Sequence, residues 1–311
     1  MKKILLAGTL AFDEVTTPFG HSGRMLGGSA SYLALAASFF DNRTGIISVT
    51  GYDFTDRMLE KFSSRGIDLS GVQRLDKHKS FYWKGYYYEN MNRRDTLVTE
   101  VNALAYFSPR VPKEFRKPDL VVLGNLHPGI QAEILNQLQA SPQLVVLDTM
   151  NFWMDNAKES LFQVIARVDL LMLNEEEARQ LTGEYSLVTA ARLIRGMGPR
   201  YVIIKRGEYG ALLFHDDGFF SAPAMPLEKV WDPTGAGDTF AGGFIGHLSE
   251  YAQPGVEAIK NAMICGANLA SFTVEDFGTK RLESLTKPEI EKRLTDFVRL
   301  TRYSLQEKVY E

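Results

Sequence analysis

The sequence predicts a three-layer α/β/α sandwich with a mainly parallel central sheet and a small antiparallel β lid. The first observation is that short β-branched runs alternate with longer helical patterns along most of the chain. The second is that the runs are apolar nearly throughout, as strands are when helices cover both faces of a parallel sheet. The third is an aromatic region that breaks this alternation. Together they predict βα units with right-handed crossovers, followed by one irregular insertion.

The expected elements follow one another in βα order from the N-terminus. Strands are expected at Ile4–Gly8, Thr44–Thr50, Leu120–Gly124, Leu144–Asp148, Leu170–Asn174 and Tyr201–Lys205. Helices are expected between them, near Ser29–Phe39, Thr55–Arg65, Gly129–Gln139, Asn156–Arg167 and Leu187–Gly196.

The pattern changes after Lys205. Ala211–His215 and Phe219–Ala222 are joined by an Asp-Gly turn and predict a hairpin at an antiparallel edge of the sheet. Long helices are then expected at about Gly237–Ser249 and Gly255–Phe272, and a last helix from about Lys287.

The aromatic region spans residues 79–107 and contains no helical segment of normal length. We interpret it as strands that project from the main sheet as a lid, with lid strands within about 13–27 and 79–107. An ordinary sheet extension or a dimer contact is the alternative. Because no repeat or flexible linker interrupts the chain, residues 1–311 are expected to form a single domain with this lid.

Composition excludes several classes of protein. The 311 residues are 45% hydrophobic and 23% charged with a net charge of −3, which argues against a nucleic-acid surface. A single cysteine, Cys265, excludes an internal disulfide. The apolar start of the chain is too short for a signal peptide, and no run approaches the roughly 18 apolar residues of a membrane span. A cytoplasmic protein is therefore expected.

The most informative segment is 232–243, with the sequence DPTGAGDTFAGG. A loop of small residues leads directly into a predicted helix, whose first N–H groups have no intrahelical partner and carry partial positive charge. Gly235, Ala236 and Gly237 leave room for an anion to reach those groups, as in phosphate sites. Asp238 would repel such an anion, a pairing that a general base meeting a hydroxyl there explains; a carboxylate that only caps the helix is the alternative.

Other phosphate-binding motifs are absent from the sequence. It contains no Gly-Lys dipeptide, so a P-loop is excluded. The Gly-Ala-Gly segment breaks the dinucleotide fingerprint at its third glycine and follows no N-terminal strand. His-Arg-Asp does not occur, so the lone Asp-Phe-Gly at residues 276–278 does not indicate a protein kinase.

The segment resembles the C-terminal signature of the ribokinase family of carbohydrate kinases (the phosphofructokinase-B type), Asp-Thr-x-Gly-Ala-Gly-Asp, with Pro233 at the second position. The resemblance implies a ribokinase-like fold, ATP and Mg²⁺ as cofactors, and Asp238 as the catalytic base beside an anion hole of Gly235, Ala236 and Gly237.

The N-terminal part of the chain is similar to the family's sugar-binding signature. Asp13 follows the first strand, at the edge where open α/β sheets place ligands, and Gly27 and Gly28 precede a helix. The resemblance assigns these residues to the hydroxyls of the phosphate acceptor. The family commonly has Asn four residues after the second glycine, whereas this chain has Tyr32, which leaves the acceptor open.

Further positions resemble the family's nucleotide and metal sites. Asn174 and Glu177 match an Asn-x-x-Glu motif associated with phosphate and water-bound Mg²⁺, which suits an ion that keeps its hydration shell. An acidic helix start is the structural alternative. The remaining matches are Lys205 and Gly207 for the nucleotide, Asn151 near the acceptor, and Asp232 and Thr234, which bind a monovalent cation in some relatives, so that K⁺ is a further candidate cofactor.

These patterns predict an ATP-dependent kinase that phosphorylates a hydroxyl of a sugar or sugar-like molecule. A nucleoside kinase of the same family is the second interpretation, because aromatic lid residues stack on bases as well as on sugar rings. A catalytically silent sugar- or nucleotide-binding regulator is the third. No nucleic-acid or membrane partner is expected, and the protein is expected to be a monomer or a lid-mediated homodimer.

Overall fold

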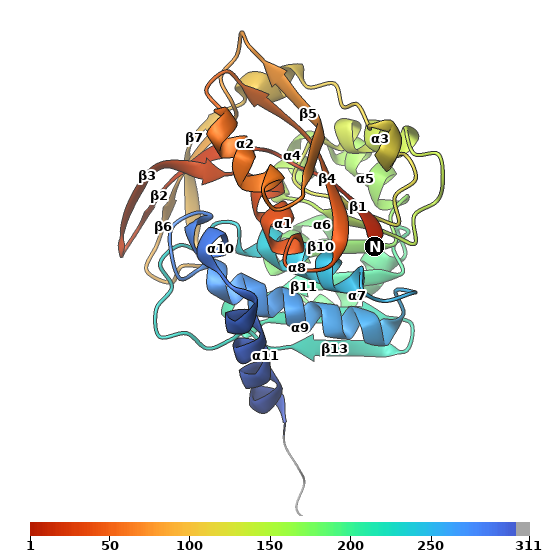
Figure 1. Cartoon of the computed structure of the whole chain (residues 1–311). Coiled ribbons are helices and arrows are strands. Elements are labelled where there is room, and N and C mark those ends of the chain that lie inside the picture. The colour runs from red at the N-terminus through yellow and green to blue at the C-terminus, as the bar shows by residue number, and fades with distance from the viewer. Residues whose placement is uncertain (303–311) are drawn as a thin grey trace, which may run out of the picture.

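The computed structural model describes residues 1–302 and contains one large and one small sheet with helices packed around the large one (Figure 1). The large sheet comprises β1 (Lys2–Ala7), β4 (Asn42–Gly51), β5 (Asp68–Leu75), β8 (Leu120–Leu123), β9 (Leu144–Asp148), β10 (Leu170–Asn174), β11 (Tyr201–Lys205), β12 (Ala211–His215) and β13 (Gly218–Ala222). The small sheet comprises β2 (Ala11–Thr17), β3 (Gly20–Gly27), β6 (Tyr82–Tyr87) and β7 (Arg94–Glu100).

The helices alternate with the strands along much of the chain. They are α1 (Ser29–Ala37), α2 (Asp56–Ser63), α3 (Pro128–Asn136), α4 (Asn151–Asn156), α5 (Lys158–Ile165), α6 (Glu175–Thr182), α7 (Leu187–Arg195), α8 (Ala236–Leu248), α9 (Val256–Thr273), α10 (Lys280–Ser284) and α11 (Lys287–Thr301). Short 3₁₀ turns lie at Asn102–Tyr106, Lys113–Phe115 and Gly207–Tyr209.

The nine-stranded sheet has the order β13-β12-β11-β10-β9-β8-β1-β4-β5. Neighbours from β11 to β5 pair in parallel, whereas β12 and β13 form an antiparallel hairpin at one edge. The predicted parallel sheet and its antiparallel edge are confirmed. β5, at the opposite edge, is an additional strand that the sequence pattern did not indicate.

Two apolar clusters, one on each face of the large sheet, explain why its central strands are apolar throughout. In β1, Ile4 and Leu6 belong to the cluster under α1, α8 and α9, whereas Leu5 and Ala7 belong to the cluster under α3, α5, α6 and α7. Successive side chains of a strand point to opposite faces, so both faces of β1 are covered. This is the predicted three-layer sandwich.

The small sheet has the order β3-β2-β6-β7 and forms the lid, which is seen at one side of the molecule in Figure 1. Its pairs are antiparallel except for β2 and β6, which run parallel. The strands lie within the two segments that the sequence indicated, residues 13–27 and 79–107, with β2 beginning slightly earlier.

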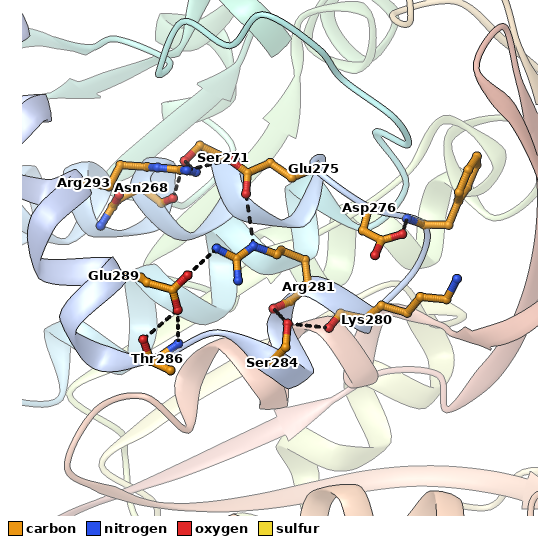
Figure 2. Close-up of polar contacts among 11 residues, drawn as sticks. Asn268, Ser271, Glu275, Asp276, Lys280, Arg281, Ser284, Thr286, Glu289 and Arg293 are labelled. Atoms are coloured by element: carbon orange, nitrogen blue, oxygen red, sulfur yellow. Dashed lines mark hydrogen bonds and ion pairs between the residues drawn. The ribbon is translucent and has the colours of Figure 1, made fainter.

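A network of charged residues fastens the C-terminal helices to α9 (Figure 2). Arg281 bridges Glu275 at 3.1 Å and Glu289 at 2.8 Å, and Arg293 pairs with Glu275 at 2.6 Å. The Arg293 guanidinium also lies 3.5 Å from the centroid of the Phe272 ring. These contacts hold α10 and α11 against α9, which packs behind α8.

Candidate active site

The ends of three neighbouring parallel strands place polar side chains at one edge of the large sheet. Asp148 ends β9, Asn174 ends β10, and Lys205 ends β11, with Met172 beside Asp148 and Asn174 beside Lys205 in the register. The carboxyl edge of an open parallel sheet is where such folds bind ligands. The N-terminus of α8 meets this edge, because Lys205 Nζ lies only 3.1 Å from where a Cβ would stand on Gly237.

Asp238 lies in the first turn of α8, among other charged side chains. Burial, together with the Asp148 carboxylate, raises the pKa of Asp238 to about 7, although Lys205 and Arg94 act in the opposite direction. A carboxyl group with a pKa near neutrality is suited to accept a proton at physiological pH. The same environment would be costly for a carboxylate that served only as a helix cap.

The loop before α8 is shaped by Gly235, which has φ 76° and occupies the N-cap position. A side chain at this position would overlap the ring of Tyr32. The N–H of Ala236 donates to Pro233 O at 3.2 Å, whereas those of Gly235, Gly237 and Asp238 have no partner within residues 1–302. These unpartnered donors at a helix start form a site that favours an anion.

Asp13 lies on the lid strand β2, buried against the loop between β3 and α1. Its Oδ2 accepts a hydrogen bond from the N–H of Gly28 at 3.2 Å. A side chain on Gly27 would overlap the Asp13 carboxylate, and Gly28 has φ 86°, so the glycine pair is required by the geometry. Burial raises the pKa of Asp13 to about 7.

Tyr32, on α1, is 1% exposed and packs its ring against Gly235. Its hydroxyl has no hydrogen-bond partner within the described part of the chain. Burial and the nearby carboxylates of Asp13, Asp232 and Asp238 raise the pKa of Tyr32 well above its usual value. The residue that departs from the family pattern therefore lies between the predicted acceptor side and the anion-binding loop.

Lys205 and Asp148 form an ion pair, with 2.6 Å between Nζ and Oδ2. Burial disfavours the ammonium, but the carboxylates of Asp148 and Glu177 more than offset this effect and raise the pKa of Lys205. Lys205 therefore remains a cation next to the start of α8.

Asn174 and Glu177 form a capping box at the start of α6. The Asn174 side chain accepts from Glu177 N at 2.8 Å, and Glu177 Oε2 accepts from Asn174 N at 2.7 Å. The Asn-x-x-Glu motif thus has a structural role of its own. Glu177 is nevertheless buried among site charges, and burial raises its pKa to about 7. Its carboxylate has the oxygen chemistry that Mg²⁺ prefers.

The predicted monovalent-cation residues hold the loop in place. Asp232 accepts from Thr234 N at 2.9 Å and from Gly278 N at 3.0 Å, and Thr234 Oγ1 donates to the Tyr87 hydroxyl at 3.2 Å. Within residues 1–302 no group of three or more His, Cys, Asp or Glu side chains is arranged to hold a metal ion. Asn151 is exposed, and its side chain accepts from the adjacent Phe152 N.

Two lid residues reach this site; the sequence indicated Tyr87 only as one of the lid's aromatic residues and did not indicate Arg94. Tyr87 ends β6 and bonds Thr234, and Arg94 begins β7 opposite it in the register. A contact between Asn92 and Glu208 at 3.4 Å brings the lid turn beside Gly207. Neither residue belongs to a recognisable motif, and the clustered aromatic residues 81–88 were the only signal that pointed to this part of the lid.

Solved structures define the class of this fold. Ribokinase from Giardia lamblia superposes with a TM-score of 0.79 over 95% of this chain and all of its own, at 18% identity. Methanocaldococcus jannaschii nucleoside kinase superposes with a TM-score of 0.76 over 95% of this chain and 99% of its own, at 19% identity. The chain therefore has the ribokinase-like α/β fold.

Sequence comparison identifies the family. The model for pfkB family carbohydrate kinases matches residues 9–285. Cytidine kinase from Thermococcus kodakarensis is 31% identical over 80% of this chain and 89% of its own, and aminoimidazole riboside kinase from Salmonella typhimurium is 27% identical over 86% and 88%. The chain belongs to the pfkB family of carbohydrate kinases, and it is an ATP-dependent phosphotransferase of the sugar and nucleoside kinase class. None of the helices within residues 1–302 combines the length and apolar character that a membrane span requires.

Proposed function

We propose that Asp238 is the general base that activates an acceptor hydroxyl for attack on the γ-phosphoryl group of ATP. The observation that carries this proposal is a half-buried carboxyl group in the first turn of α8, beside the unpartnered N–H groups of Gly235 and Gly237. A hydroxyl and a phosphoryl group must meet at one point for transfer. Asp238 would take the proton from the hydroxyl while the N–H groups hold the phosphoryl oxygens.

The environment of Asp238 suits this role. Its pKa of about 7, raised mainly by burial, keeps much of the carboxyl ionised at neutral pH while retaining appreciable basicity. Asp13, across the site on the lid strand, would accept hydrogen bonds from acceptor hydroxyls, and Gly27 and Gly28 allow the acceptor to approach the backbone. Tyr32 and Asn151 complete the proposed acceptor side.

Cationic groups must offset the charge of the triphosphate. Lys205 stands beside Gly237 and would contact phosphate oxygens, and Gly207 and Asn174 would border the nucleotide. Glu177 would hold Mg²⁺ through water, and the bound ion would supply charge neutralisation for the phosphates. Asp232 and Thr234 would contribute oxygens to a K⁺ site beneath the loop; both already stabilise the loop through hydrogen bonds.

For the acceptor we propose a nucleoside, with a free sugar as the second candidate. Curated relatives include a cytidine kinase, an aminoimidazole riboside kinase and a nucleoside kinase from Methanothermobacter thermautotrophicus. A bifunctional ribokinase is also related, at 25% identity, and it supports a free sugar as the second candidate acceptor. These names shift the preference from the free sugar, which the motifs favoured, towards a ribose that carries a base.

An ADP-release screen tests the proposal. The purified protein would be assayed with MgATP against pyrimidine and purine nucleosides, free pentoses, hexoses and keto-sugar acids, with and without added K⁺. We expect the highest kcat/KM among the nucleosides. Turnover confined to free sugars would overturn the nucleoside assignment while keeping the kinase.

The silent-regulator alternative has its own outcome in the same screen. That alternative would be favoured if calorimetry showed that the protein binds ATP and an acceptor, but no member of the panel caused ADP release. The Asp217→Asn variant serves as a matched control for substitutions of site carboxylates, because Asp217 is 89% exposed on the β12–β13 hairpin.

A further inference from the structure

Arg94 carries a positive charge from the lid into a site that is rich in carboxylates. It begins β7, and its Nη1 lies 3.5 Å from the Tyr87 hydroxyl on the neighbouring strand. The guanidinium also lies 5.6 Å from the centroid of the Trp83 ring. Tyr87 in turn accepts a hydrogen bond from Thr234, in the loop that precedes α8. One chain of contacts therefore links the arginine to the proposed phosphate site.

The charged groups of the site act on the Arg94 guanidinium. Tyr87, Glu177 and Asp238 favour the charged form of Arg94 and raise its pKa. Conversely, Arg94 lowers the pKa values of Asp13, Glu177 and Asp238, which burial raises. These carboxylates belong to the lid, to α6 and to α8, so the charge of Arg94 acts on three parts of the site.

Three carboxylates of the site are engaged by groups other than Arg94, so the guanidinium is available to bind an anion. Asp148 is paired with Lys205, and Asp13 and Glu177 accept backbone N–H groups. Arg94 itself makes no ion pair with a carboxylate within residues 1–302, and the residue as a whole is exposed. An unpaired, accessible guanidinium is suited to receive an oxyanion, because its fork of N–H donors matches phosphate oxygens.

We propose that Arg94 is a catalytic residue that contacts the phosphoryl group during its transfer. This inference rests on the proposed function and extends it. The acceptor oxygen forms a bond to the γ-phosphorus and gives its proton to Asp238, while the bond between that phosphorus and the bridging oxygen breaks and ADP leaves with the electron pair. Arg94 keeps its protons throughout and stabilises the charge on the transferring group.

The Arg94→Gln variant should lower kcat by about 10²–10³-fold, the usual loss when one preorganised donor to a transition-state oxygen is removed. Arg94→Lys should recover part of the loss, because it restores the charge but not the fork. Arg93→Gln is the matched control: Arg93 is the adjacent arginine, and it stacks on Tyr88, 4.5 Å from the ring centroid. We expect Arg93→Gln to retain wild-type kcat.

A binding measurement separates this role from one in which Arg94 only neutralises the carboxylates of Asp13, Glu177 and Asp238. Calorimetry with Mg²⁺ would compare ADP with a non-hydrolysable ATP analogue. Arg94→Gln should lose affinity for the triphosphate by at least about tenfold more than for the diphosphate, whereas a neutralising role predicts equal changes. An Arg94→Gln variant with unchanged preference between the nucleotides and near-normal turnover overturns the inference alone. A wild-type protein that phosphorylates no acceptor overturns the proposed function as well.

Discussion

Tyr32 places its phenol ring between two parts of the proposed kinase site, the acceptor side and the loop that precedes α8. Its ring packs directly against Gly235, and position 235 requires glycine because any side chain there would overlap the ring. The sequence showed that an aromatic residue replaces the amide that the family commonly has. It could not show that the hydroxyl would be enclosed, because that depends on how α1 packs against the loop before α8.

The Tyr32→Phe variant should be more stable than the wild type. A buried hydroxyl without a partner costs about 1–3 kcal/mol, and Phe keeps the ring that packs on Gly235. We expect the free energy of unfolding, measured by urea titration, to rise by about 1 kcal/mol. Tyr52→Phe is the control, because Tyr52 is 55% exposed. A Tyr32→Phe variant less stable than the wild type would show that the hydroxyl has a partner.

Several site residues could be predicted from sequence because short motifs hold them. Asp13, Gly28, Lys205, Gly235 and Asp238 lie close to the carboxyl edge of the sheet, as the strand ends implied. Their catalytic roles stay predictions.

Tyr87 and Arg94 lie outside any motif, because their position depends on the pairing of β6 with β7 rather than on a local pattern. Within residues 1–302, the side chain of Asn151 makes a hydrogen bond only with the N–H of the adjacent Phe152.

At the scale of elements, the lid and the phosphate loop are joined by the hydrogen bond from Thr234 to Tyr87. Tyr87 is buried, whereas the adjacent Tyr86 is 39% exposed, as expected for neighbours on opposite faces of a strand. The bond joins β6 to the loop before α8, and we therefore expect it to help hold the lid closed during transfer.

The Tyr87→Phe variant should weaken lid closure. Losing a hydrogen bond of about 1 kcal/mol shifts a closure equilibrium roughly fivefold. We expect a higher acceptor KM and a larger share of ATP hydrolysed without acceptor phosphorylation, because water enters the site more readily. Parallel assays of ADP and phosphorylated acceptor would measure both. If Tyr87→Phe behaved like the Tyr86→Phe control, the bond would have no part in closure.

The elements that the sequence predicted are those with strong periodicity. The buried parallel strands have continuous apolar runs, and the helices that cover them range from α7, which buries one face, to α1, whose residues are all buried. β5 escaped prediction because it is an edge strand with a mixed pattern, and only one of its residues, Gly71, is buried. The start of α6 was indicated only as the alternative to a ligand motif at Asn174 and Glu177, although a capping box begins the helix.

For the whole molecule, the site is a concentration of buried acids that the fold tolerates at a cost. Asp13, Glu177 and Asp238 have pKa values of about 7, raised mainly by burial. In the unfolded chain these carboxyl groups titrate near pH 4. Between those values the folded protein binds more protons than the unfolded chain, so these groups make the free energy of unfolding fall as pH rises.

The melting temperature of the ligand-free protein should reflect this linkage. From pH 5.5 to pH 8 we expect wild-type stability to decline, and to decline less in Asp238→Asn, which removes one of the groups with a raised pKa. Asp217→Asn should follow the wild type. Scanning calorimetry at both pH values measures the difference. An identical pH dependence in Asp238→Asn and the wild type would mean that Asp238 is not protonated in this range.

The central claim, that Asp238 is the base, is tested most directly by kcat of the Asp238→Asn variant, with acceptor binding measured alongside. The amide keeps the shape of the carboxylate but cannot accept the proton, so kcat should fall by at least about 10²–10⁴-fold while acceptor affinity is largely kept. Near-normal turnover by Asp238→Asn, on an acceptor that the wild type phosphorylates, would contradict the claim.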